Sequence, residues 1–175
     1  MKTLLNSEKL HITLNRLAHR LVENYFDSGN LVIIGIQPRG VLLSQRIYNI
    51  VCNLMPDSKP EYGVLDITFH RDDVHNHLRL PNITKIETSI ENKKVVLIDD
   101  VLYTGRTIRS ALDALLDFGR PAKVELLTLI DRRFNRELPV QPDYVGMSVD
   151  TILSQHVVVK WSENAASEEV ILIDK

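Results

Sequence analysis

The chain has 175 residues, of which 44% are hydrophobic and 25% charged, and its formal net charge is −2. Such a composition is typical of one globular domain with its own core, so we expect a single domain over residues 1–175, and the near-neutral charge argues against indiscriminate nucleic-acid binding. The lone Cys52 excludes a disulfide framework, and without a signal-peptide pattern or a membrane-length apolar run we expect a cytoplasmic protein with no membrane partner.

The first third of the sequence alternates strand and helix patterns. Residues 2–5 predict a short strand. From Ser7, which we expect to be the N-cap, apolar residues recur every three or four positions as far as Tyr25 and predict one face of a helix. The apolar run at residues 31–36 predicts a buried strand, and a second amphipathic pattern follows Gly40.

The loop between that strand and that helix contains Pro38, Arg39 and Gly40. A strand-to-helix turn is a common anion-binding position, and a guanidinium can hold two phosphate oxygens at once. The simpler alternative is a plain helix N-terminus that carries a surface arginine.

A long polar segment follows the next predicted strand, at residues 63–69. Residues 70–92 show no hydrophobic period, and a segment of that length in a compact domain is usually disordered or a functional lid. His70, His75 and His77 lie in it, but without a second ligand cluster we do not expect zinc there.

The most informative stretch is VVLIDDVLYTGRT, at residues 95–107. A short apolar strand ends in Asp99 and Asp100, and a glycine- and threonine-containing turn then opens a helix. Free N–H groups at a helix start favour a phosphate, whereas carboxylates accept hydrogen bonds from sugar hydroxyls, directly or through a divalent cation. The stretch therefore predicts a site for a ligand that has both a phosphate and a diol, unless it is a plain strand-to-helix turn with solvated acids.

The remaining sequence continues the strand and helix alternation. The helix after residue 107 is expected to end at Phe118, and residues 123–130 predict a strand that runs into an arginine-rich loop. Three short β-like segments follow, at residues 144–146, 156–161 and 170–173. This order predicts a mainly parallel sheet, with ligands at the carboxyl ends of its strands.

Residues 95–107 resemble the motif by which type I phosphoribosyltransferases bind 5-phosphoribosyl-1-pyrophosphate (PRPP): apolar residues, two acids and T-G-x-T. This family has an α/β fold, with a mainly parallel twisted sheet flanked by helices and a flexible hood loop, here at about residues 70–92. Tyr103 matches neither the purine nor the orotate enzymes. The strings LDITFHRDD, DFGRPAKVELLTLIDRR and RELPVQPDYVG extend the likeness to the PyrR branch, over residues 11–161.

The resemblance implies a uracil phosphoribosyltransferase, a pentosyltransferase that makes UMP and pyrophosphate from uracil and PRPP with Mg²⁺. It implies catalytic roles for Arg39, Asp99 and Asp100, with Mg²⁺ near the two acids, and a uracil site bordered by Arg132 and Val157. The PRPP-binding residues that it implies are Pro38, Arg39, Gly40, Arg71, Asp99, Asp100, Val101, Leu102, Tyr103, Thr104, Gly105, Arg106 and Thr107.

Members of the PyrR branch also bind leader mRNA of pyrimidine genes in response to UMP, and they form homodimers or homotetramers. The matching RNA-binding positions are Arg16 and His19 in the first helix and Arg136 in the arginine-rich loop. Two alternatives stay open: an RNA-binding regulator that uses the PRPP pocket only as a nucleotide sensor, and a phosphoribosyltransferase for another base. The sequence departs from the branch in an arginine-rich loop one residue longer and at Asn15, Gln141 and Met147.

Overall fold

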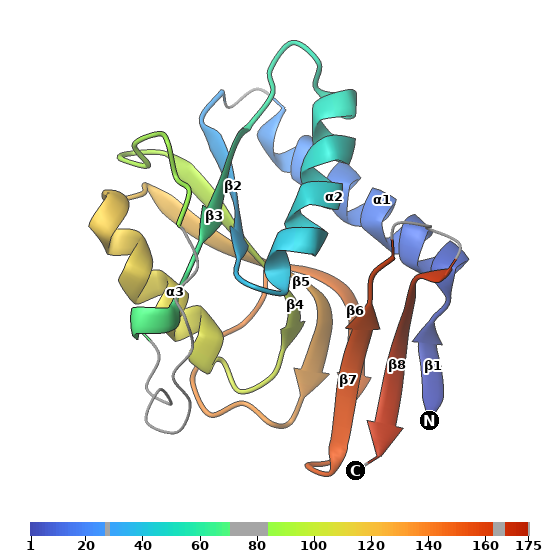
Figure 1. Ribbon diagram of the computed structural model, residues 1–175. Helices are drawn as coiled ribbons and strands as arrows, with labels where there is room; N and C mark the ends of the chain where they lie inside the picture. Colours follow the sequence, from blue (N-terminus) through green and yellow to red (C-terminus); the bar gives the residue numbers. More distant parts are fainter. Residues whose placement is uncertain (27–28, 71–83, 163–166, 175) are drawn as a thin grey trace.

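The computed structural model describes residues 1–26, 29–70, 84–162 and 167–174 (Figure 1). Its elements, in chain order, are β1 (Lys2–Leu5), α1 (Ser7–Tyr25), β2 (Leu31–Ile36), α2 (Gly40–Leu54), β3 (Glu61–Leu65), η1 (Thr68–His70), β4 (Lys94–Leu102), α3 (Arg106–Leu115), η3 (Leu116–Phe118), β5 (Lys123–Arg133), β6 (Tyr144–Asp150), β7 (Gln155–Lys160) and β8 (Glu169–Asp174).

Five strands form a wholly parallel sheet in the order β3-β2-β4-β5-β6. Helices α1 and α2 cover one face of this sheet and α3 covers the other (Figure 1). Neighbouring residues of a strand therefore enter different cores: Ile33 packs with α1 and α2, whereas Ile34 packs with α3. Burial on both faces explains why these strands are continuous apolar runs rather than alternating patterns. The predicted α/β fold with a mainly parallel sheet is confirmed.

A second, antiparallel sheet stands beside the first, in the order β1-β8-β7 (Figure 1). Its three strands coincide closely with segments that the sequence predicts as β. Their assembly into a separate sheet was not predicted, because β8 pairs with β1 from the other end of the chain and no local pattern encodes that pairing. Strand β7 of this sheet places His156 and Val157 in the wall of the cavity described below.

Several predicted boundaries were wrong. Asn6, and not Ser7, is the N-cap of α1, since its side chain accepts a hydrogen bond from the Lys9 N–H at 2.9 Å. The strand expected at residues 63–69 is β3, which begins and ends earlier and is followed by the 3₁₀ turn η1. The third helix gives way after Leu115 to the 3₁₀ turn η3, which ends at the predicted residue, Phe118.

The two central strands are longer than predicted. β4 continues through both acids to Leu102, and β5 continues to Arg133. The acids thus lie within a strand rather than in a loop, because β4 pairs with β5 on one side up to Leu102↔Asp131. A polar residue interrupts a hydrophobic pattern without interrupting the backbone hydrogen bonds, and this is why the pattern ended too early.

At the opposite end of β5, a polar cluster closes the core. The Glu125 carboxylate accepts hydrogen bonds from the hydroxyls of Tyr25 and Tyr144, the latter at 2.7 Å, and pairs with Lys123. Burial alone would raise the pKa of Glu125, but the hydrogen bonds from Lys123 and the two tyrosines outweigh burial and hold this pKa below its ordinary value. The cluster joins the end of α1 to β5 and β6.

Among the described residues, no helix is both long and apolar enough to cross a membrane.

Candidate active site

Predicted site residues from four separate parts of the chain meet around the carboxyl ends of β2, β4 and β5, beside β7. They surround a cavity of about 330 Å³. The cavity is lined by Gln37, Pro38, Arg39, Asp99, Asp100, Val101, Tyr103, Thr107, Arg132, His156 and Val157. The topology explains the convergence, because the carboxyl ends of parallel strands lie at one edge of a sheet.

The two acids form the floor of this cavity. Asp99 is 8% exposed and Asp100 is 4% exposed, and the Asp99 carboxylate accepts a hydrogen bond from the Asp100 N–H at 2.9 Å. Burial raises the pKa of Asp100 above its ordinary value, and the nearby Arg39 guanidinium offsets only part of that rise. Two carboxyl groups that line one cavity are suited to a ligand that donates hydrogen bonds.

The loop of Pro38, Arg39 and Gly40 lies directly over β4. The Gln37–Pro38 peptide is cis, and the Gln37 N–H donates to the Leu65 carbonyl at 2.9 Å. A Cβ at residue 40 would lie 2.3 Å from the Ile98 carbonyl oxygen, so only glycine permits this approach. The close packing places the Arg39 side chain, which is exposed, at the rim above the two acids.

A second cavity, of about 240 Å³, is formed by the turn between β4 and α3. Gly105, with φ +93°, is the N-cap residue of α3, so the first N–H groups of that helix face the turn. The two cavities share four lining residues, Asp99, Val101, Tyr103 and Thr107. They are therefore neighbouring parts of one site. The second cavity alone is lined by Leu102, Thr104, Gly105, Arg106 and Ile108, the last of which the sequence did not predict.

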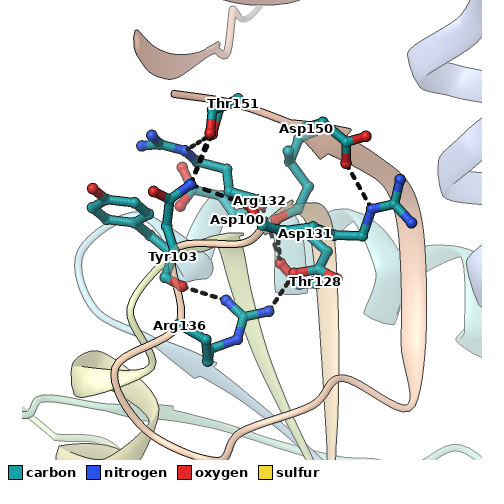
Figure 2. A network of polar contacts seen from close by, with 11 residues as sticks. Asp100, Tyr103, Thr128, Asp131, Arg132, Arg136, Asp150 and Thr151 are labelled. Atoms are coloured by element: carbon teal, nitrogen blue, oxygen red, sulfur yellow. Dashed lines mark hydrogen bonds and ion pairs between the residues drawn. The ribbon is translucent and has the colours of Figure 1, made fainter. Parts of the chain in front are cut away.

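Arg132 lines the first cavity beside Tyr103. It is 3% exposed, and its guanidinium donates to the Thr151 hydroxyl at 3.0 Å and to the Gln155 carbonyl at 2.7 Å. The guanidinium carbon also lies 3.9 Å from the centre of the Tyr103 ring, a cation–π contact (Figure 2). Burial lowers the pKa of Arg132, and the contact with Tyr103 partly opposes that effect. A planar donor group is thus held in one orientation beside Val157.

Two residues of the cavity were missed by the sequence analysis. His156 precedes Val157 on β7, and Gln37 precedes Pro38. Their only signal in the sequence was their position next to predicted site residues.

The three candidate RNA-binding residues differ in their exposure to solvent. Arg16 and His19 are exposed on α1, where Arg16 donates to the Gly146 carbonyl of β6 at 2.5 Å and His19 bonds the Asn15 carbonyl at 2.8 Å. Arg136 instead turns inward, donates to the Tyr103 carbonyl and pairs with Asp131 at 2.5 Å (Figure 2).

Some predicted features lie outside the described residues. These are Arg71, most of the hood loop, His75 and His77. Across the described ranges, no group of three or more His, Cys, Asp or Glu side chains could hold a metal ion. The carboxylates of Asp99 and Asp100 nevertheless suit Mg²⁺, which takes oxygen ligands and usually keeps only one or two from protein while substrate and water supply the rest.

Comparison with known proteins identifies the family of the chain. The model of the phosphoribosyl transferase domain family matches residues 1–164. Bifunctional protein PyrR from Actinobacillus pleuropneumoniae is 41% identical over 174 residues, which cover 98% of this chain and 96% of that protein. Bifunctional protein PyrR from Deinococcus radiodurans is also 41% identical over 174 residues, with 98% and 94% covered.

Solved structures show the same fold at lower identity. A hypoxanthine phosphoribosyltransferase from Trypanosoma cruzi has a TM-score of 0.75 and 17% identity, with 98% of this chain and 95% of that chain covered. A hypoxanthine phosphoribosyltransferase from Staphylococcus aureus has a TM-score of 0.66 and 24% identity, with 85% and 77% covered. Because the family model matches residues 1–164 and the PyrR relatives align over nearly the whole chain, the chain belongs to the phosphoribosyltransferase family, in its PyrR branch.

Proposed function

We propose that the protein is a uracil phosphoribosyltransferase, which joins N1 of uracil to C1 of the PRPP ribose and releases pyrophosphate. The observation that carries the proposal is the shared cavity wall. Asp99 lines both the cavity of the two acids and the cavity of the phosphate turn. One PRPP molecule can therefore place its diol on the carboxylates and its 5′-phosphate on the backbone of residues 103–107.

The residues act by orientation and charge rather than as nucleophiles. Breaking the bond from C1 to pyrophosphate builds positive charge on the ribose and negative charge on the leaving group. The diol held by Asp99 and Asp100 fixes the sugar, and Arg39 at the rim stabilises the pyrophosphate through charge-assisted hydrogen bonds. The hood loop, at about residues 70–92 and including Arg71, would keep water from the electron-poor sugar.

The acids would also hold Mg²⁺ together with the oxygens of PRPP. When bound, Mg²⁺ supplies further neutralisation of the pyrophosphate charge. The fit rests on the two carboxylates, because the described residues provide no cluster that could bind the ion without substrate.

For the base, uracil would lie between Arg132 and the backbone near Val157. Uracil has two ring carbonyls that accept hydrogen bonds, and the fixed guanidinium is a donor. The likeness to PyrR proteins supports uracil over other bases.

The test is a substrate panel that measures PRPP-dependent pyrophosphate release with uracil, orotate, hypoxanthine and guanine. We expect release with uracil and Mg²⁺, and release near background with the other three bases. Turnover with orotate or a purine in place of uracil would identify a phosphoribosyltransferase for that base. Binding of PRPP without turnover of any base would favour a regulator that keeps the pocket as a nucleotide sensor.

We propose a second function for the same chain, UMP-responsive binding of leader mRNA from pyrimidine genes by a homodimer or homotetramer. The exposed Arg16 and His19 on α1 support it, as do the names of the relatives. Gln141 and Met147 replace cations that are common in this branch, so fewer phosphate contacts are available. We expect retained binding with a shallow salt dependence, measured on pyrimidine-operon leader RNA with and without UMP at several salt concentrations. Equal affinity for an unrelated RNA would contradict this function.

A further inference from the structure

We propose that Arg136 is a positioning residue for the turn that holds the 5′-phosphate of PRPP. The proposal rests on the proposed transferase function and deepens it. It assigns to Arg136 a task inside the active site, although the sequence analysis placed this residue on an RNA-binding surface.

The loop that follows β5 forms hydrogen bonds to two successive carbonyls of residues 103–107, which we call the phosphate turn. The Arg136 guanidinium donates to the Tyr103 carbonyl (Figure 2). The Thr104 carbonyl accepts the N–H of Glu137 at 3.0 Å and the N–H of Leu138 at 3.2 Å. Both carbonyls are therefore held by one short segment, residues 136–138.

These bonds orient the N–H groups that the phosphate needs. In a trans peptide the C=O and the N–H point in opposite directions. Holding the Tyr103 carbonyl therefore aims the Thr104 N–H away from the loop, and holding the Thr104 carbonyl does the same for the Gly105 N–H. Within the described residues, neither N–H donates to a backbone carbonyl outside the helices and strands, so both remain available to a ligand. An arrangement fixed before binding costs less entropy when the phosphate arrives.

Arg136 is itself fixed at its other side. Its guanidinium pairs with Asp131 at 2.5 Å, and the two side chains are only 22% and 12% exposed. The pair holds the guanidinium in one place and also neutralises a carboxylate that would otherwise lie near the phosphate turn. A third link, between the Arg106 Nε and the Glu137 carboxylate at 2.6 Å, runs along the exposed side of the same contact.

Arg133, the last residue of β5, offers a matched control. Its guanidinium pairs with Asp150 at 2.8 Å, and its side chain is 53% exposed. Replacing it removes the same charge from the same segment without removing a bond to Tyr103.

The experiment compares the wild-type protein with Arg136→Ala, Arg136→Lys and Arg133→Ala. We expect Arg136→Ala to raise the KM for PRPP by about tenfold or more, the usual effect of losing a hydrogen bond from a charged group. The KM for uracil should change much less, because Thr151 and Gln155 anchor Arg132 independently. Arg136→Lys, which can keep one of the two bonds, should fall in between, and Arg133→Ala should match the wild type.

Equal increases of both KM values in Arg136→Ala, accompanied by a lower Tm, would assign Arg136 a structural role and overturn the proposal. An unchanged KM for PRPP would also overturn it. Calorimetric titration of PRPP with Mg²⁺ into all four proteins distinguishes a failure of the positioning role from a failure of the transferase function. If the wild type fails to turn over uracil, the transferase function fails, while a weaker Kd for PRPP in Arg136→Ala alone would still support the positioning role.

Discussion

Replacing Asp99 and Asp100 together by asparagine is expected to lower kcat/KM with uracil and PRPP by at least about 10²-fold, the scale on which preorganised polar groups act in active sites. Two carboxylates can accept every hydrogen bond from the ribose diol and can share a cation, whereas each amide presents donors on one of its two ends. Steady-state release of pyrophosphate measures this loss. Asp113→Asn, which alters an exposed acid on α3 paired with Arg109, is the matched control and should retain full activity.

The same substitution is not expected to unfold the protein. Burial raises the pKa of Asp100, so its ionised form is less favourable in the folded chain than in the unfolded chain. The free energy of unfolding of the wild type therefore falls as the pH rises from the unfolded pKa of about 3.9 through the raised folded pKa of Asp100. Asparagine does not ionise, so the variant does not lose this stability. Chemical denaturation at pH 4 and at pH 7 should therefore show the single Asp100→Asn variant at least as stable as the wild type at pH 7, and without that advantage at pH 4.

A double variant that is folded and turns over within a few-fold of the wild type would remove the two acids from the mechanism. A single Asp100→Asn variant that is much less stable at pH 7 would instead show that the carboxylate has a structural task.

Arg39→Ala is expected to lower kcat/KM by about 10²-fold or more, because charge-assisted bonds to the pyrophosphate strengthen as the leaving group gains charge. The side chain is exposed, so its removal should leave the Tm nearly unchanged. Loss of the guanidinium also removes the charge that lowers the pKa of Asp100, which should rise further.

Arg39→Lys is the control that keeps the charge and loses the bidentate geometry, and we expect it to recover only part of the activity. Binding of inorganic pyrophosphate, measured by calorimetry, should weaken in both variants in the same order. If Arg39→Ala binds pyrophosphate and turns over like the wild type, the loop of residues 38–40 does not hold the leaving group.

The sequence predicted those parts of the protein in which local pattern and tertiary structure agree. β2 was predicted with both of its ends, because six apolar residues stand between polar ones. The turn of residues 104–107 was predicted because a glycine between threonines separates an apolar run from an amphipathic pattern, and the structure begins α3 there. The extension of β4 through Asp99 and Asp100 was not predicted, because pairing with β5 overrides the poor strand preference of aspartate.

Two features of the site depended on contacts that a linear pattern does not contain. The sequence placed Arg136 in a basic loop but could not tell which side of the loop it faces, and the answer depends on Asp131 and the Tyr103 carbonyl. His156 reaches the cavity only because β7 stands beside the central sheet, which requires pairing between distant segments.

The position of β8 has a consequence for how the enzyme matures. β8 lies between β7 and β1, so Glu169–Asp174 supply the hydrogen bonds that hold the strand of His156 and Val157. Because β8 follows both β1 and β7 in the chain, neither neighbour can gain these hydrogen bonds until β8 has been synthesised. We therefore expect the wall of His156 and Val157 to become ordered after the central sheet.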